Sequence, residues 1–393
     1  MTHRRRLLVT GFIALLLAAS LVVAIVWLVG GHNAGQPLSS GQPTLSQSQV
    51  RRQRISGPVH AAGMRILDSS GRAVRIDSLV LMNYGTRSDK PWLALSDQDF
   101  DNIAGWGFNS VRLNFSWAHL EPRAPSVGQG GSLTHHWDRG YLRDIDAAVS
   151  GFTRRHVAVI LDLYQFGWFP QMPLWLYPSR LSFFQAQCDF VSGRREPGAP
   201  IDPQRGAADV WRMMAGRYRA NPMVIGADLL TEPDCPSRSG QGVKLDPLYS
   251  RLTRAIRSAN PKIMIVFEDY IAAIVQKSGS GVTLSPDRNA MYAFHLYRPD
   301  WALAKGTLDS YIRHGRDLRV PPWLGEFDAF GANRRDKPPP GDWQALTMTL
   351  FEYLRAHDVS GWAYWAYRGT GSVFEGDGTT VDTELIRSLQ TGF

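Results

Sequence analysis

Short apolar runs alternate with amphipathic stretches along most of this chain, from about residue 57 to the C-terminus. Each run has the length and composition of a buried strand, and each intervening stretch carries apolar residues at helical spacing. The expected strands are 79–84, 110–114, 157–163, 224–230, 263–267, 291–295, 323–326 and 361–365. The expected helices are 97–106, 141–155, 204–218, 248–259, 303–318, 343–357 and 383–388.

Strands that alternate with helices in this way predict an α/β fold, and eight of them favour a (β/α)8 TIM barrel over residues 57–393. A small hairpin, 64–68 with 73–76, is expected just before the first barrel strand. The alternative is an open doubly wound sheet. No Gly-x-Gly-x-x-Gly turn follows the first expected strand, so the pattern gives that alternative no nucleotide-binding support.

The first 56 residues have a different character. Residues 7–29 are apolar with few interruptions, and three arginines occupy positions 4–6. About 20 apolar residues span a bilayer, so we expect a cytoplasmic basic stub at 1–6 and a transmembrane signal anchor at 7–29. Residues 30–56, rich in Gly, Ser, Gln and Pro, are expected to form a flexible linker. The catalytic domain would then lie outside a cell membrane, or be secreted if the segment is a cleaved signal peptide.

The charge of the chain is concentrated in this N-terminal region. Six arginines and no acidic residue precede residue 55, whereas 37 basic residues face 35 acidic ones beyond it. The net charge of +8 therefore gives no indication of nucleic-acid binding by the folded domain and points to a membrane surface as the partner of the N-terminal arm. An exported chain meets oxidising conditions, in which its two cysteines, Cys188 and Cys235, either form a disulfide or remain free thiols.

Two glutamates at strand ends are the candidate catalytic pair. Glu232 follows the fourth expected strand and Glu326 ends the seventh. Burying a carboxylate is costly unless it is paired, and the C-terminal ends of barrel strands line the active face. Two facing carboxylates are what a glycosidase needs. Glu268, with Asp269 beside it, ends the fifth strand and competes for this role, but it lacks a flanking motif.

Five motifs, taken in order, resemble those of glycoside hydrolase family 5. They are 107–113, Thr231-Glu232-Pro233, His295-Leu296-Tyr297, Gly325-Glu326-Phe327 and 362–365. The resemblance implies a retaining glycosidase of β-linked glycans on a TIM barrel, without metal or cofactor. It makes Glu232 the acid/base and Glu326 the nucleophile. It also implies substrate-site roles for Arg112 and Tyr297 beside the nucleophile, for His295 near the scissile bond, and for Trp365 under the sugar.

Two positions depart from the pattern of that family. Thr231 stands where the family usually has Asn before the acid/base, and Tyr164 stands where it usually has His. Thr231 offers one hydroxyl group where an amide would offer a donor and an acceptor on separate atoms, so recognition of the bound sugar is expected to differ. The segments 162–165 and 173–175 are similar to the endoglycoceramidase branch, which implies a glycolipid substrate.

Several alternatives stay open on the sequence. The barrel could be catalytically silent and bind cell-envelope carbohydrate, or it could be a transglycosylase that uses the same dyad. The aromatic residues of the loop after the third strand either form a substrate platform or pack the loop against the barrel; they are Trp168, Phe169, Trp175 and Tyr177. His295 could also be a core histidine that only satisfies hydrogen bonds. The sequence fixes neither the sugar nor the oligomeric state.

Overall fold

The computed structural model describes residues 53–81, 95–164, 172–179, 183–235, 243–270, 281–298, 300–331, 341–369, 371–375 and 378–393. The chain divides into two units, 1–46 and 47–393, and all described residues belong to the second. The expected basic stub, signal anchor and nearly all of the linker therefore lie outside the described residues. Within the ranges given, no helix has both the length and the apolar character needed to cross a membrane.

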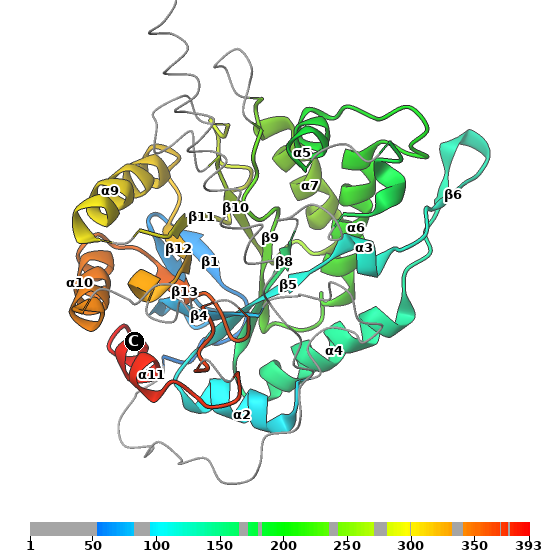
Figure 1. Cartoon of the computed structure of the whole chain (residues 1–393). Coiled ribbons are helices and arrows are strands. Elements are labelled where there is room, and N and C mark those ends of the chain that lie inside the picture. The colour runs from blue at the N-terminus through cyan, green and yellow to red at the C-terminus, as the bar shows by residue number, and fades with distance from the viewer. Residues whose placement is uncertain are drawn as a thin grey trace, which may run out of the picture. The chain divides into compact units, whose positions relative to one another are not determined.

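Eight parallel strands form a closed barrel in chain order (Figure 1). They are β4 (Ile76–Leu81), β5 (Ser110–Phe115), β8 (Ala158–Leu163), β9 (Val224–Asp228), β10 (Met264–Glu268), β11 (Ala290–Leu296), β12 (Pro322–Phe327) and β13 (Gly361–Tyr364). The ring closes where β13 pairs with β4. All eight predicted strands are present, seven of them within two residues of their expected ends, and the barrel rather than the doubly wound sheet is confirmed.

Only the first strand is displaced from its predicted position, since it begins at Ile76 instead of 79. The sequence pattern does not show this start, because the polar residues Asp77 and Ser78 interrupt the apolar run. Both are buried: the Asp77 carboxylate accepts the backbone N–H of Trp362 and lies 4.0 Å from Arg75 Nε, and the Ser78 hydroxyl contacts that of Ser110. The rest of the predicted strand, 82–84, lies outside the described residues.

Helices surround the strands (Figure 1). Most of them begin at a residue whose side chain caps the helix. Asp138, Asp202 and Asp300 each accept backbone N–H groups in the first turn of a helix, which satisfies donors that the helix itself leaves unpaired. The main helices are α2 (Asp97–Gly105), α4 (Arg139–Arg154), α6 (Pro203–Arg217), α7 (Asp246–Ala259), α9 (Trp301–Asp317), α10 (Trp343–Ala356) and α11 (Thr383–Gln390). These match the seven predicted helices to within two residues at each end.

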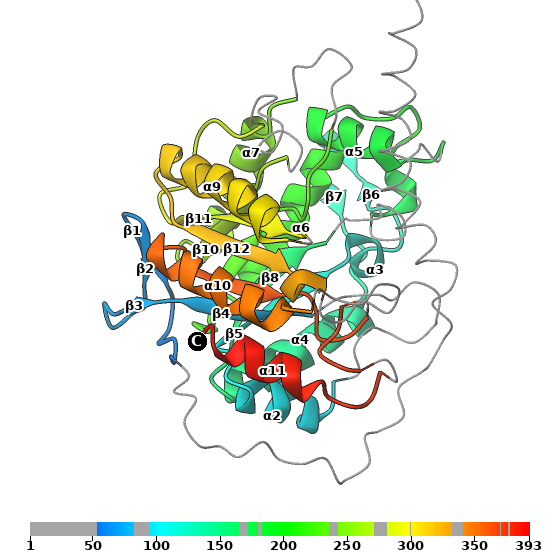
Figure 2. The same cartoon turned by 60° about the vertical axis from the view of Figure 1, so that its left-hand side comes forward.

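A small antiparallel sheet closes the N-terminal end of the barrel (Figure 2). Its strands are β1 (His60–Ala62), β2 (Arg65–Leu67) and β3 (Ala73–Val74), and the last two form the predicted hairpin. Ile66 and Val74 from this sheet share one apolar cluster with Ile76, Ala158 and Met264, which lie near the starts of barrel strands. The N-terminal end of the barrel is therefore filled by apolar side chains, which leaves the C-terminal end of the strands for a functional site.

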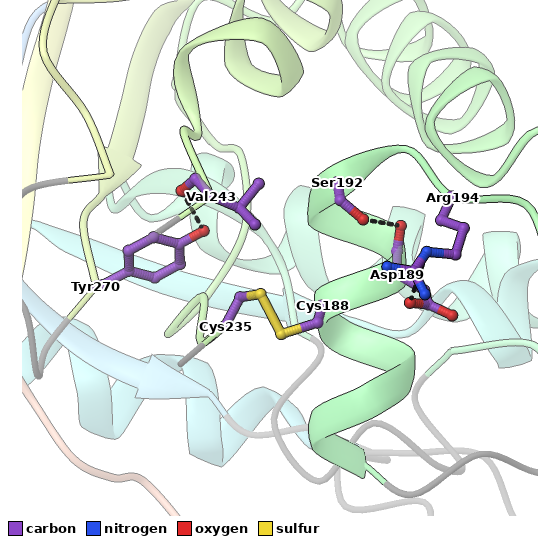
Figure 3. The surroundings of a disulfide bond; sticks show 7 residues. All are labelled: Cys188, Asp189, Ser192, Arg194, Cys235, Val243 and Tyr270. Carbon is purple, nitrogen blue, oxygen red and sulfur yellow. Dashed lines mark hydrogen bonds and ion pairs between the residues drawn. A yellow bond between two sulfur atoms is a disulfide. The ribbon is translucent and has the colours of Figure 1, made fainter. Parts of the chain in front are cut away.

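The sequence pattern did not indicate the elements inserted after β5 and β8. After β5 come α3 (Trp117–Leu120) and a ribbon of β6 (Ser126–Val127) with β7 (Leu133–Thr134). After β8 comes α5 (Phe183–Ser192), so Cys188 lies in a helix. Cys188 and Cys235 form a disulfide with their Cα atoms 4.7 Å apart (Figure 3). The bond joins α5 to the segment that follows β9.

Candidate active site

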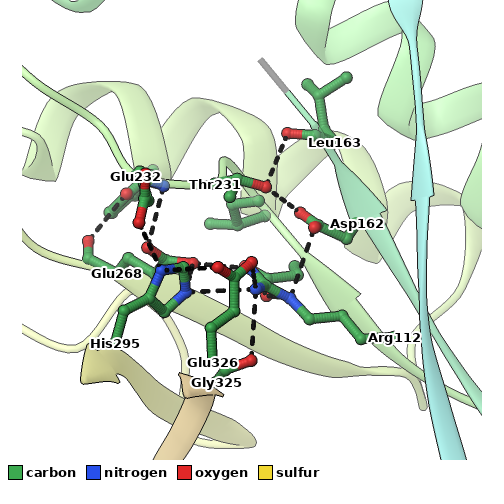
Figure 4. Close-up of polar contacts among 12 residues, drawn as sticks. Arg112, Asp162, Leu163, Thr231, Glu232, Glu268, His295, Gly325 and Glu326 are labelled. Atoms are coloured by element: carbon green, nitrogen blue, oxygen red, sulfur yellow. Dashed lines mark hydrogen bonds and ion pairs between the residues drawn. The ribbon is translucent and has the colours of Figure 1, made fainter. Parts of the chain in front are cut away.

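One arginine organises the C-terminal end of the barrel (Figure 4). Arg112, on β5, is fully buried, and its guanidinium lies within ion-pair distance of four carboxylates. The shortest contacts are 2.6 Å to Glu268, 2.7 Å to Glu326, 2.8 Å to Asp228 and 3.4 Å to Asp162. These carboxylates come from β10, β12, β9 and β8, so a single side chain links half of the barrel.

Glu326 has a donor at each carboxylate oxygen. Arg112 Nη1 donates to Oε1 at 2.7 Å, and the Tyr297 hydroxyl donates to Oε2 at 2.7 Å. The structure therefore places Arg112 and Tyr297 against the predicted nucleophile, as the family resemblance implies. Glu326 is itself buried. Two directed donors hold this buried carboxylate in one orientation.

Glu232 reaches the same point from the fourth barrel strand. His295 Nδ1 lies 2.7 Å from Glu232 Oε1 and 3.2 Å from Glu326 Oε2, so the imidazole bridges the two glutamates. One oxygen of each glutamate and one nitrogen of His295 all lie within 4.8 Å of one another. Glu232 keeps part of its side chain exposed, at 18%, whereas Glu326 keeps only 3%. The more exposed carboxyl group is the one that could reach a departing oxygen and water.

Charges of both signs set the protonation of this cluster. Burial raises the pKa of Glu326 to about 8, of Asp162 to about 8 and of Asp228 to about 6, although Arg112 opposes each rise. Burial alone would lower the pKa of His295, but the Glu268 and Glu326 carboxylates raise it well above its usual value. His295 therefore contacts both members of the dyad, and it is not an inert core histidine.

The two positions that depart from the family pattern also lie at this end of the barrel. The Thr231 hydroxyl donates to Asp162 Oδ1 at 2.6 Å, so its proton is already directed to a protein partner. The Tyr164 ring stacks near Trp365, with ring centroids 6.2 Å apart and planes inclined by 29°. Trp365 is half-buried and Tyr164 is buried. Together the rings offer an aromatic surface suited to the apolar face of a sugar.

Two of the aromatic residues after β8 pack against the barrel instead of forming a platform. The Trp175 ring meets Trp117 edge to face at 5.7 Å, and its indole N–H donates to the Glu121 carbonyl at 2.9 Å. Tyr177 is fully buried. Trp168 and Phe169 lie outside the described residues. For the described pair, the packing interpretation is therefore the correct one.

Sequence reasoning missed two members of the cluster. Asp228 sits inside an apolar run and gives no local signal, yet it lies 2.8 Å from Arg112. Glu268 was noted only as a competitor of the dyad. It contacts Arg112, His295 and the Glu232 backbone, so it supports the dyad instead of replacing it. The sequence offered one signal for Asp228. It is a polar residue an even number of positions before the end of its expected strand, so its side chain points to the same side of the sheet as the residue at the strand end.

Glu232, His295 and Glu326 also have the ligand types of a metal site. A metal would need a neutral imidazole nitrogen with a free lone pair. Both nitrogens of His295 face carboxylates at 2.7–3.2 Å, and its pKa is raised. The chemistry of this trio fits a hydrogen-bond network better than a metal centre.

Paired carboxylates at the C-terminal ends of the fourth and seventh strands of a closed (β/α)8 barrel define a retaining glycosidase. The chain belongs to the cellulase family, glycosyl hydrolase family 5, whose family model matches residues 67–371.

Relatives within this family include enzymes with different names. The chain is 25% identical over 370 residues to an endoglucanase of Paenibacillus polymyxa, covering 83% of this chain and 84% of that protein. It is 26% identical over 250 residues to endoglycoceramidase I of Rhodococcus hoagii, covering 54% of this chain and 46% of that protein. Endo-glycoceramidase II from Rhodococcus sp. shares the fold, with a TM-score of 0.67 at 22% identity over 82% of this chain and 80% of that one.

Proposed function

We propose that this glycosidase cleaves a β-linked glycan or glycolipid by double displacement, with Glu326 as nucleophile and Glu232 as acid/base. The observation that carries the proposal is the spacing of the dyad, in which one oxygen of each carboxylate lies within 4.8 Å of the other. Retaining enzymes hold their carboxyl groups about 5–5.5 Å apart, whereas inverting enzymes need roughly 6.5–9.5 Å to admit a water molecule.

In the first step a Glu326 oxygen attacks the anomeric carbon, and the bond to the leaving oxygen breaks as Glu232 transfers its proton to that oxygen. In the second step Glu232, now a carboxylate, takes a proton from water. The hydroxide so generated attacks the anomeric carbon and releases Glu326. Arg112 and Tyr297 hold the attacking carboxylate in place, and His295 faces both members of the dyad.

The sugar to be cleaved would rest on Trp365, with the Tyr164 ring beside it. Thr231 stands next to the acid/base, where it would face the hydroxyls of this sugar while its own hydroxyl donates to Asp162. These residues form the proposed substrate site, and no step depends on a cofactor.

The names of the relatives support a substrate class. An endoglucanase acts on a β-glucan, and an endoglycoceramidase acts on a glycolipid; one solved neighbour is a complex of endo-glycoceramidase II with ganglioside GM3. We take both classes as candidates, and the similarity of segments 162–165 and 173–175 to the endoglycoceramidase branch favours glycolipid.

The proposed location is outside the cell, on a membrane anchor formed by residues 7–29 and a linker at 30–56. The disulfide between Cys188 and Cys235 supports an oxidising compartment. A glycolipid presented by a membrane would suit an enzyme tethered beside it. Fractionation of cells that express the full chain, with protease added from outside, tests both parts of this location.

The test of function uses the full-length chain with cello-oligosaccharides, lactosylceramide, ganglioside GM3 and aryl β-cellobiosides and β-lactosides. The wild type should release a sugar of retained β configuration, observed by proton NMR at early times. Glu232→Gln and Glu326→Gln serve as paired variants. Turnover that survives Glu326→Gln unchanged would contradict the mechanism. Glycan binding without turnover in the wild type would favour the silent barrel, and products lengthened by an added sugar acceptor would favour transglycosylation.

A further inference from the structure

Glu268 touches the proposed acid/base by two separate routes. Its Oε2 accepts the backbone N–H of Glu232 at 2.9 Å. Its Oε1 lies 3.1 Å from Nε2 of His295, whose Nδ1 lies 2.7 Å from the Glu232 carboxylate. Glu268 ends strand β10 and is buried at 2% exposure, so these contacts are fixed by the barrel.

We propose that Glu268 is a positioning residue for Glu232, which it holds in place through the backbone and through the side chain of His295. This inference rests on the proposed function, because it takes Glu232 as the acid/base.

The backbone route matters because Glu232 has a left-handed conformation, with φ at +44°. A residue with a side chain adopts this conformation only where its surroundings hold it. The carbonyl of Glu232 accepts a hydrogen bond from Gln187 Nε2 at 3.2 Å, and the preceding N–H, of Thr231, donates to Leu163 at 3.3 Å. The N–H of Glu232 itself is held by the charged Glu268 carboxylate, which makes the strongest type of hydrogen bond of the three.

The histidine route depends on charge. His295 Nε2 lies 3.2 Å from Arg112 Nη1, so a protonated imidazole and the guanidinium would repel each other. Glu268 Oε1 offsets this repulsion, since it lies 2.6 Å from Arg112 Nη2 and 3.1 Å from His295 Nε2. The other charges facing His295 are Glu232 from the segment after β9 and Glu326 from β12. Asp228 from β9 joins the cluster through Arg112.

The adjacent carboxylate shows that this arrangement is specific to Glu268. Asp269 is also buried, but it accepts the N–H groups of Tyr270, Gly281 and Val282 and lies 3.1 Å from His314 Nε2. None of these contacts involves the dyad. Asp269→Asn is therefore a matched control, with the same loss of a buried charge one residue away.

The first measurement is kcat/KM of Glu268→Gln on two aryl β-lactosides or β-cellobiosides that differ only in leaving group. A phenyl leaving group needs a proton from the acid, whereas 2,4-dinitrophenyl leaves without one. We expect about a 10- to 100-fold loss for the phenyl glycoside and a much smaller loss for the dinitrophenyl glycoside. Asp269→Asn should lower the two rates equally or leave them unchanged. Equal losses on both substrates for Glu268→Gln would overturn the proposal.

The second measurement is the pH profile of kcat/KM on the phenyl glycoside. A negative charge strengthens the binding of nearby protons, so its removal lowers the pKa of His295 and of Glu326. The acid limb of the profile, which reports Glu326, should therefore move to lower pH in Glu268→Gln and stay in place in Asp269→Asn. A Glu268 that served only the fold would lower the height of the profile and leave the acid limb where it is.

Glu232→Gln separates failure of this inference from failure of the proposed function. The acid/base assignment holds if the wild type is active and Glu232→Gln loses more activity on the phenyl glycoside than on the dinitrophenyl glycoside. The result for Glu268→Gln then decides only whether Glu268 positions Glu232. Should Glu268→Gln fail to fold, Glu268→Asp takes its place. It keeps the charge near Arg112 but draws the carboxylate back from the Glu232 N–H, so the same leaving-group pattern is expected, and its absence would overturn the proposal.

Discussion

The phenol oxygen of Tyr297 lies 2.7 Å from Oε2 of Glu326, and its hydroxyl donates to that carboxylate. Arg112 Nη1 donates to the other oxygen at the same distance. Both donors favour the ionised nucleophile, but they act against burial, which raises the pKa of Glu326 to about 8. The balance at Glu326 is therefore sensitive to either donor.

Removing the Tyr297 donor should move the acid limb of the pH profile. In Tyr297→Phe the ring remains but one hydrogen bond to the charged form is lost, which is worth about 1.5 kcal/mol and hence about one pKa unit. The pKa of Glu326 rises, so kcat/KM should begin to fall at a pH higher by about that amount. Tyr292→Phe is the matched control, because the Tyr292 hydroxyl is buried with no partner among the described residues. An acid limb that stays in place in Tyr297→Phe would argue against this balance.

Arg112 should be essential for stability as well as for activity. A lysine has one ammonium group, which cannot reach Asp162, Asp228, Glu268 and Glu326 together as the guanidinium does. Breaking buried ion pairs from one side costs about 3–5 kcal/mol, and Arg112→Lys should lower the free energy of unfolding in urea by an amount of that order. Arg217→Lys, at a pair with Asp146 that is more than a third exposed, should cost about 1 kcal/mol or less. Similar small losses in both variants would contradict the assigned role of Arg112.

Trp365 should contribute to sugar binding. Its half-buried ring lies beside Tyr164, and removal of a large apolar surface from a binding site costs about 1.5–3 kcal/mol, or roughly 10- to 100-fold in affinity. We expect this loss when lactose or cellobiose binding to Glu326→Gln is compared by calorimetry with binding to Glu326→Gln/Trp365→Ala. Trp301→Ala changes a tryptophan on outer helix α9 that packs on Tyr353, and it should leave binding unchanged. Unaltered affinity in the Trp365 variant would remove this residue from the substrate site.

The sequence predicts the barrel well because its elements are encoded locally. Helices such as 141–155 and strands such as 110–114 depend on the spacing of nearby apolar residues, and the structure has them within two residues of their expected ends. The charge cluster is different, since Arg112 meets Asp228 and Glu326 across separations of 116 and 214 residues. Such contacts depend on closure of the barrel. No local pattern could show that Glu268 supports Glu232 or that Thr231 donates to Asp162.

The last prediction concerns the disulfide and its link to the acid/base. Cys235 lies three residues after Glu232, and Gln187, next to Cys188, donates to the Glu232 carbonyl at 3.2 Å. The bond thus ties helix α5 to the segment that carries the proposed proton donor (Figure 3).

Opening this bond should lower both stability and turnover. The bond closes a loop of 47 residues, for which the chain-entropy model gives roughly 4 kcal/mol of stabilisation. Reduced wild type should lose much of this and also lose kcat, because Glu232 is held less firmly, with a smaller change in KM. The double variant Cys188→Ser/Cys235→Ser should behave like the reduced wild type and show no further response to reductant. Two titratable thiols in the unreduced folded protein, or an equal response of the double variant to reductant, would show that this bond does not hold the acid/base segment.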